Sequence, residues 1–278
     1  MSGFSIMALL IGLITPQVDF TRTADVSFMP GPRGKLDVYA PRAPHADAPV
    51  VVFFYGGGWD SGDKALYRFV GASLARAGVV AVIPNYRVYP QARYPDFLQD
   101  NARAVRWARD HAAAFGADPD KLFLAGHSAG AYEAAMLTLD RRWLAGAGLD
   151  AWRDVRGAIG LSGPYDFLPL HSTVLKTIFG PPETLPATQP INYVDGRAPP
   201  MLLITGDDDP TVAPGNSERL QEKIVSRGGR AELVIYPKAR HAATITALLP
   251  VFASGLDVRR RMLDFIQAHA ASDMRAAA

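Results

Sequence analysis

The sequence contains no cysteine and carries little net charge. Among its 278 residues there is no thiol, so disulfide bonds, thiolate nucleophiles and zinc–thiolate sites are excluded. The formal net charge is +2 and no run of lysine and arginine occurs, which argues against a nucleic-acid partner. Hydrophobic residues make up 49% and charged residues 20%, a composition typical of globular domains.

Long hydrophobic runs are also missing. The apolar stretch from Phe4 to Ile14, within an N-terminal segment 1–20, is too short to span a bilayer. Its length suits the core of a signal peptide, but a basic n-region and a clear Ala-x-Ala cleavage site are absent. We therefore expect a helix that packs on the domain or over the site entrance. A degenerate export signal or a membrane-surface anchor is the alternative, and a cytoplasmic location is the default.

Short apolar runs alternate with helical patterns along most of the chain. Runs rich in β-branched or aliphatic residues, typical of buried strands, lie at 50–54, 79–83, 121–125, 157–161, 201–205 and 232–236. Amphipathic or helix-forming segments separate or follow them at 65–77, 95–114, 131–137, 217–227 and 257–270. This alternation predicts a doubly wound, mostly parallel α/β sheet. Segments 25–28 and 35–39 flank a Gly-Pro-Arg-Gly turn and predict an antiparallel hairpin at the sheet edge.

The chain is predicted to form a single domain over residues 1–278, because neither an internal repeat nor an interdomain linker is visible. One segment, 162–200, does not fit the alternation and is rich in proline and glycine. It is too long for an ordinary connection, and long loops in compact domains are usually functional. We interpret it as a short cap insertion over the site.

A glycine-flanked serine stands at the corner of a strand, a turn and a helix. Residues 126–130 have the sequence Gly-His-Ser-Ala-Gly, between the strand ending at 125 and the helix at 131–137. Glycine two positions before and two after a serine is typical of the nucleophile elbow, where larger side chains would collide with neighbouring backbone. Ser128 is therefore the candidate nucleophile.

A serine hydroxyl needs a base to take its proton and a third group to orient that base. In open α/β sheets the site lies beyond the carboxyl ends of the strands, so both partners should follow late strands. Of the six histidines only His241 does so, and Asp207, Asp208 and Asp209 follow the strand 201–205. Three adjacent carboxylates without any other ligand pattern make a poor metal site, so no metal is expected.

The remaining histidines are assigned to other places. His127 lies inside the elbow and is expected to point away from the site, and His45 lies in a loop. His111 and His269 are expected on solvated helix surfaces, whereas His171 lies in the predicted cap, where it could touch substrate.

A run of three glycines follows the first buried strand. Residues 55–59 have the sequence Tyr-Gly-Gly-Gly-Trp, and glycine lets a backbone approach a substrate closely. Backbone N–H groups aimed at a developing oxyanion contribute ~2.7–4 kcal/mol each. We expect the donors to be the N–H groups of Gly57, Gly58 and Ala129. A phosphate cradle is the alternative, but neither Gly-Lys-Ser/Thr nor Gly-x-Gly-x-x-Gly is present.

Taken together, these motifs resemble the α/β-hydrolase superfamily, in particular the hormone-sensitive-lipase-like and kynurenine-formamidase-like carboxylesterases. The run 55–59 looks like the His-Gly-Gly-Gly-Trp motif of that family, and 126–130 looks like its elbow. Residues 85–88 and 94–100 look like its Tyr-Arg-Leu…Pro…Asp segment. Asp209-Pro-Thr-Val is similar to its Asp-x-x-Val acid loop, which favours Asp209 over the runner-up Asp208. The resemblance covers roughly residues 35–268.

The resemblance implies metal-independent hydrolysis of carboxylic esters without a cofactor. Tyr55 departs from the family pattern, where a histidine helps to hold the oxyanion loop. Because tyrosine can also donate a hydrogen bond, altered loop support is expected rather than lost activity. By the same analogy Arg87 and Asp100 would form an ion pair that braces the loop.

The sequence thus predicts a serine carboxylesterase that acts on small to medium esters through an acyl-enzyme of Ser128, with His241 as base and Asp209 as its partner. The expected partner is a small-molecule ester, and the protein would be a monomer or a homodimer. Candidates for the apolar substrate pocket are Trp59, Phe167, Leu168 and Leu170.

Three alternatives are weighed against this prediction. An amidase of the arylformamidase type would use the same triad. A peptidase of the prolyl-oligopeptidase type usually carries a propeller domain, for which this chain has no room. A non-catalytic binding protein on the same fold is disfavoured because serine, aspartate and histidine are all present.

Overall fold

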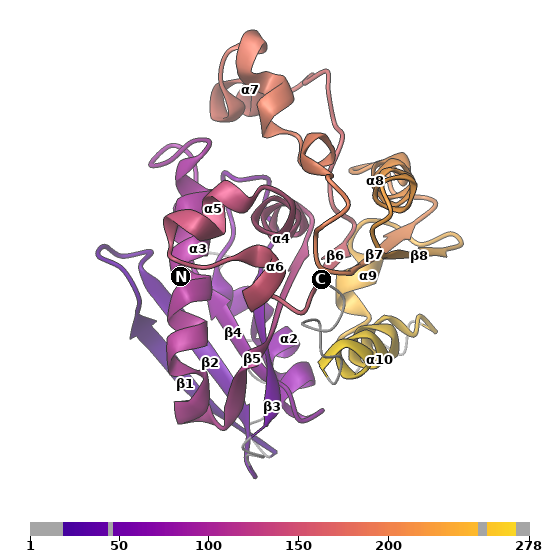
Figure 1. Cartoon of the computed structure of the whole chain (residues 1–278). Helices are drawn as coiled ribbons and strands as arrows, with labels where there is room; N and C mark the ends of the chain where they lie inside the picture. The colour runs from indigo at the N-terminus through magenta and orange to yellow at the C-terminus, as the bar shows by residue number, and fades with distance from the viewer. Residues whose placement is uncertain (1–18, 44–46, 250–254, 271–278) are drawn as a thin grey trace, which may run out of the picture.

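The computed structural model describes residues 19–43, 47–249 and 255–270. Its eight strands form one sheet in the order β1-β2-β4-β3-β5-β6-β7-β8, and helices cover both faces (Figure 1). The predicted N-terminal apolar helix and His45 lie outside the described residues. None of the helices within these ranges has the length and hydropathy of a membrane span.

The strands confirm the predicted fold class and the edge hairpin. The antiparallel part consists of β1 (Phe20–Ser27), β2 (Lys35–Pro41) and the contact of β2 with β4 (Val80–Pro84). From β4 onward neighbouring strands are parallel: β3 (Ala48–Phe54), β5 (Ala117–His127), β6 (Gly157–Leu161), β7 (Met201–Gly206) and β8 (Ala231–Tyr236). Parallel neighbours place the carboxyl ends of β5, β7 and β8 at one edge of the sheet.

The longer helices lie where the sequence pattern predicts them. They are η1 (Lys64–Tyr67) with α2 (Arg68–Ala75), α3 (Asp96–His111) with η2 (Ala112–Phe115), α4 (Ala129–Leu139), α8 (Gly215–Ser226) and α10 (Val258–Ala270). Shorter helices were not predicted, because one or two turns give no readable period: α5 (Arg141–Gly146), α6 (Ala151–Asp154), α7 (Thr173–Phe179), η3 (Pro182–Thr188), η4 (Pro190–Tyr193) and α9 (Ala243–Thr246).

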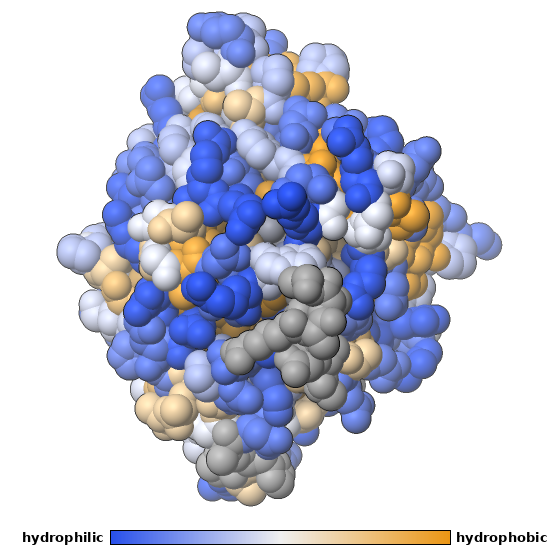
Figure 2. Space-filling view, in the orientation of Figure 1, coloured by the Kyte–Doolittle hydropathy of each residue, from blue (hydrophilic) through white to orange (hydrophobic). Residues whose placement is uncertain are grey.

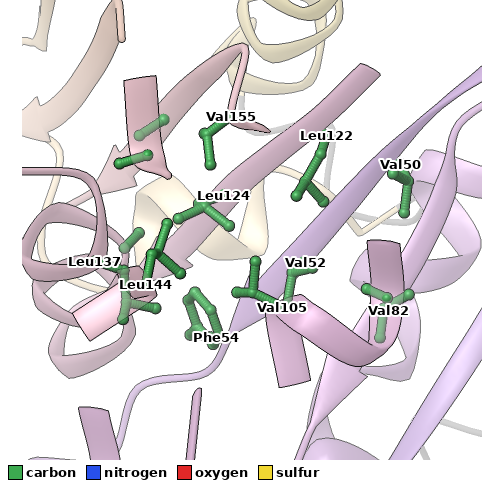
Figure 3. Packing of buried hydrophobic residues seen from close by; sticks show 14 of the residues in the cluster. Val50, Val52, Phe54, Val82, Val105, Leu122, Leu124, Leu137, Leu144 and Val155 are labelled. Atoms are coloured by element: carbon green, nitrogen blue, oxygen red, sulfur yellow. The ribbon is translucent and has the colours of Figure 1, made fainter. Parts of the chain in front are cut away.

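Two apolar layers, one on each face of the sheet, form the core. Along β3, Val50, Val52 and Phe54 enter the layer beneath α3 and α4, whereas Val51 and Phe53 enter the layer beneath α2 and α10. Figure 3 shows the first layer, with Val52 and Phe54 close to Val105 of α3. Burial on both faces explains why the central strands are continuous apolar runs, and each large side chain contributes about 1.5–3 kcal/mol.

Residues 162–200 contain α7, η3 and η4. In Figure 1, α7 stands away from the sheet, above α4 and α5. Phe179 at the end of α7 packs edge-on against Trp59 and Tyr132, with ring centroids 4.8 and 5.6 Å apart. The face shown in Figure 2 is mainly hydrophilic, with apolar residues in separate small patches.

Candidate active site

Ser128 occupies a strained turn that only glycine neighbours permit. Its φ of 55° and ψ of −122° lie in a region rarely adopted by residues with a side chain. A Cβ on Gly126 would lie 2.1 Å from the carbonyl oxygen of Gly130, and one on Gly130 would lie 2.0 Å from that of Phe54. Both distances are far inside van der Waals contact, so the turn requires glycine at both positions.

The side chains of Ser128, His241 and Asp209 meet at the carboxyl ends of β5, β8 and β7. Ser128 Oγ lies 2.9 Å from His241 Nε2, and His241 Nδ1 lies 2.7 Å from Asp209 Oδ2. The Asp209 carboxylate is fully buried, and its other oxygen accepts the backbone N–H groups of Thr211 and Val212, each at 2.9 Å. The hydroxyl, the imidazole and the carboxylate therefore form one continuous chain of hydrogen bonds.

The other two aspartates after β7 have different surroundings. Asp208 is exposed, and Asp207 accepts the backbone N–H of Lys238. Among the described residues, the imidazole of His241 forms no hydrogen bond with either of these two carboxylates. The geometry therefore brings Asp209, and not the runner-up Asp208, to the histidine.

His127 does not point away from the site, contrary to the prediction. Its ring lies 4.9 Å from that of His241, centroid to centroid, and its Nε2 lies 3.2 Å from the His241 carbonyl oxygen. The prediction was wrong because the chain at His241 passes within hydrogen-bond distance of the end of β5. Burial, together with the neighbouring His241, lowers the pKa of His127 to about 4, so His127 is neutral at pH 7.

The glycine run 56–58 adopts backbone conformations that suit the predicted oxyanion loop. Gly57 and Gly58 have φ values of 143° and 59°, and a Cβ on Gly57 would lie 2.3 Å from the Ser61 carbonyl oxygen. Ala129 is the first residue of α4, so its N–H has no partner within the helix. Among the described residues, Gly58 and Ala129 line the cavity beside Ser128 and Gly57 does not.

The predicted ion pair between Arg87 and Asp100 is confirmed. Arg87 donates from Nε and one terminal nitrogen to the two carboxylate oxygens, both at 2.8 Å, and its backbone N–H donates to Oδ2 at 3.1 Å. Asp100 is fully buried on α3. Such a bidentate pair fixes the segment after β4 against α3.

A cavity of about 330 Å³ opens beside Ser128. Three of the predicted pocket residues, Trp59, Phe167 and Leu170, line it. Leu168 does not, and packs instead, partly buried, against a cluster that includes Tyr132 and Phe179. Further residues that line the cavity were not predicted, because most of them lie in segments without a periodic pattern. They come from the loop between β6 and α7, from α7 itself, from the loop after β7 and from the start of α8: Pro164, Pro169, Ser172, Leu175, Thr211, Val212, Ala213 and Asn216. His171, expected in the cap, also lines the cavity.

A larger hollow of about 540 Å³ lies near the starts of β3, β4 and β5, beside α10. Ligands in open α/β sheets bind at the carboxyl ends of the strands, so the smaller cavity is the candidate site. Within the described ranges, no group of three or more histidine, aspartate or glutamate residues could hold a metal ion.

The strand order, the antiparallel edge and the strained serine between β5 and α4 define an α/β-hydrolase. Within that superfamily the chain belongs to the BD-FAE family, whose sequence model matches residues 36–224. The resemblance predicted from the motifs is thereby confirmed.

Solved structures share the fold. Esterase B from Lactobacillus rhamnosis has a TM-score of 0.81 at 19% identity, covering 99% of this chain and 95% of that one. A truncated carbohydrate esterase from gut microbiota has a TM-score of 0.78 at 22% identity, covering 91% of this chain and 98% of that one.

Curated relatives carry esterase names. A probable isoprenylcysteine alpha-carbonyl methylesterase ICMEL1 of Arabidopsis thaliana is 29% identical over 231 residues, which are 76% of this chain and 48% of the relative. Esterase LipQ of Mycobacterium tuberculosis is 29% identical over 247 residues, 81% of this chain and 58% of the relative. The chain thus spans about half the length of these relatives.

Proposed function

We propose that the protein is a serine carboxylesterase that hydrolyses small to medium carboxylic esters. The observation that carries the proposal is the chain of hydrogen bonds from Ser128 through His241 to Asp209, at 2.9 and 2.7 Å. The esterase names among the relatives and solved structures support ester rather than amide chemistry.

The mechanism follows from this arrangement. His241 Nε2 takes the proton of Ser128 as Oγ attacks the acyl carbon, and Asp209 orients the imidazole and stabilises its cation. The N–H groups of Gly57, Gly58 and Ala129 donate to the oxyanion. His241 then delivers its proton to the departing alcohol, which leaves an acyl-enzyme on Ser128. A water molecule, deprotonated by His241, attacks this ester; His241 returns the proton to Ser128 Oγ as the acyl–oxygen bond breaks, and the acid is released.

The cavity suggests the size and polarity of the substrate. Its volume of about 330 Å³ suits a small or medium group, with residues 162–200 acting as a short cap over it. The lining residues include Trp59, Phe167 and Leu170 but, within the described chain, no lysine, arginine, aspartate or glutamate. The pocket therefore favours an uncharged apolar or aromatic group over a charged one.

The test is steady-state hydrolysis of p-nitrophenyl esters of increasing acyl length, with an aryl formamide alongside, by wild type and Ser128→Ala. Ser73→Ala is the control, because this buried serine of α2 bonds Arg259 away from the site. We expect short esters to be hydrolysed by wild type and Ser73→Ala but not by Ser128→Ala. Preference for the formamide would move the assignment to an amidase. Failure of wild type on every substrate would favour a binding protein.

A further inference from the structure

A buried carboxyl group lies directly behind the oxyanion loop. Glu133 of α4, the helix that follows Ser128, is 0% exposed. Its Oε1 accepts a hydrogen bond from the indole Nε1 of Trp59 at 2.9 Å, and its Oε2 accepts one from Asn101 Nδ2 of α3 at 3.2 Å. Burial raises the pKa of Glu133 to about 8, so the group is mainly a neutral acid at pH 7.

Glu133 is the only ionisable carboxyl group on the helix α4, whose other residues are almost all apolar. Every residue of α4 is buried, and besides Glu133 and Thr138 its side chains are those of alanine, glycine, leucine, methionine and tyrosine. Removing a carboxyl group from water is unfavourable unless its hydrogen bonds are made. The two partners of Glu133 therefore identify what the group does: it joins α4, α3 and the loop at Trp59.

Trp59 is the first side chain after the three glycines of the oxyanion loop. Its φ of 62° is rarely adopted by a residue with a side chain, so surrounding contacts must hold it there. Its carbonyl oxygen accepts the N–H of Tyr89 at 2.8 Å, and its indole N–H is held by Glu133. These bonds fix the conformation at the end of the glycine run.

The indole of Trp59 also shapes the cavity beside Ser128. It is 4% exposed, lines that cavity, and stacks on Phe167 of residues 162–200 with centroids 6.0 Å apart. A rotation of this ring would move the wall of the pocket, and it would also break the indole hydrogen bond that helps to hold Trp59 at the end of the glycine run. Its only side-chain hydrogen bond within the described residues is the one to Glu133.

We propose that Glu133 is a positioning residue of the esterase site, which holds the oxyanion loop and the pocket wall by accepting the indole N–H of Trp59. This inference rests on the proposed function. Glu133 does not touch the substrate or the reacting atoms; it acts through Trp59. The role requires a hydrogen-bond acceptor at position 133 for the indole N–H of Trp59, but it does not require a negative charge there.

Two substitutions of Glu133 separate these requirements. Glu133→Gln keeps an oxygen for the indole N–H. Its NH₂ group can donate to Asn101 Oδ1 once the Asn101 amide turns over, and this oxygen is buried and has no partner among the described residues. Glu133→Leu removes the acceptor and leaves the N–H unpaired. For a short p-nitrophenyl ester we expect Gln to keep kcat within about 3-fold and Leu to lower it roughly 10- to 100-fold, the rate equivalent of one unpaired buried donor.

Trp59→Phe removes the same hydrogen bond from the other side. We expect a loss of kcat comparable to that of Glu133→Leu, and little further loss when the two are combined, because both remove one interaction. Thr138→Val is the control: it deletes another buried polar group of α4, whose one hydrogen bond among the described residues is to the carbonyl of Ala134, and should leave kcat unchanged. Rates are divided by the amount of protein whose active-site serine a fluorophosphonate labels, so that unfolded protein does not contribute to the measured kcat.

The proposal is overturned if labelled Glu133→Leu turns over like wild type, if Gln loses as much as Leu, or if the two single losses multiply in the double variant. Should Glu133→Leu not fold, Trp59→Phe alone decides, since an unchanged kcat there contradicts the proposal. If wild type is inactive, or if Ser128→Ala is active, the esterase assignment itself is overturned. These results differ from every outcome that tests Glu133, so the two failures can be told apart.

Discussion

The guanidinium of Arg33, in the turn between β1 and β2, donates a hydrogen bond to the hydroxyl of Tyr55 across 2.5 Å. The same guanidinium donates to the carbonyl oxygens of Tyr86 at 2.6 Å and Gly62 at 2.9 Å. The ring of Tyr55 stacks between those of Tyr67 and Tyr86, with centroids 5.7 and 4.6 Å away. The start of the predicted oxyanion loop is thus held from the edge hairpin, by a tyrosine at the position where the family pattern has histidine.

Tyr55→Phe tests this support. The substitution keeps the stacked ring but leaves the Arg33 guanidinium without one acceptor, and hydrogen bonds to charged groups contribute about 1.5–3 kcal/mol. We expect the free energy of unfolding in urea to fall by about that amount and kcat to fall less than 10-fold. Tyr89→Phe is the control, because its hydroxyl makes no hydrogen bond within the described chain. Equal stability of the two variants would contradict the assigned role.

Asp209→Asn tests the proposed partner of the base. The amide can still accept the N–H groups of Thr211 and Val212, but toward His241 Nδ1 it presents a donor and favours the wrong tautomer. We expect kcat to fall by about 10³-fold or more with little change in stability. Asp208→Asn removes the adjacent exposed carboxylate and should leave kcat unchanged. The reverse result in ester hydrolysis would exchange the two assignments.

Glycine at 130 is tested by Gly130→Ala against Gly146→Ala. A Cβ at 130 would lie 2.0 Å from the Phe54 carbonyl oxygen, whereas one at 146 meets no atom within 4 Å. Overpacking of this kind costs about 1–3 kcal/mol or more, and alanine in place of an exposed helical glycine gains about 0.5–1 kcal/mol. Thermal unfolding should therefore show a lower Tm for Gly130→Ala and an equal or higher Tm for Gly146→Ala. The elbow geometry is contradicted if both variants match wild type.

Glu133 should make stability fall as the pH rises from about 4.5 to 8. Burial raises the pKa of Glu133 from its ordinary 4.5 to about 8, so in this window the folded chain holds a proton that the unfolded chain has released. The stabilisation that this proton contributes is fully present below pH 4.5. It is lost as the pH rises from 4.5 to the pKa of the folded protein, with a slope of up to ~1.4 kcal/mol per pH unit.

The side chain of Glu133→Gln cannot titrate, so the variant should lack this loss of stability with rising pH. The Tm of the variant relative to wild type should rise steadily between pH 5 and pH 8. His127 acts with the opposite sign at lower pH, because burial lowers its pKa to about 4, but its effect is common to both proteins and cancels in the difference. Parallel Tm profiles would show that Glu133 is already ionised in the folded protein.

The sequence allowed the sheet and its long helices to be predicted because their patterns extend over several residues. Val50 to Phe54 could only be a strand buried on both faces, and Ser128 was marked by its two glycines. The spacing did not choose among Asp207, Asp208 and Asp209, since the choice depends on how the backbone at 211 and 212 holds one carboxylate.

What escaped prediction depends on contacts between distant segments. His127 was misplaced because its surroundings are made by the chain at His241, and Leu168 because the turn of a loop decides which side chain faces a cavity. Glu133 was visible as an acidic residue in an otherwise apolar helix, but its partner Trp59 is contributed by a different loop. Helix α7, within residues 162–200, is too short to show a period.

The most direct test of Ser128 as the nucleophile is covalent labelling by a fluorophosphonate followed by peptide mass spectrometry. An activated serine attacks phosphorus, fluoride leaves, and the phosphonyl group stays on Oγ. The proposed mechanism predicts one phosphonyl group per chain, on the peptide that contains Ser128, with loss of ester hydrolysis in proportion and no labelling of Ser128→Ala. A label on another residue, or an unlabelled protein that still hydrolyses esters, would contradict it.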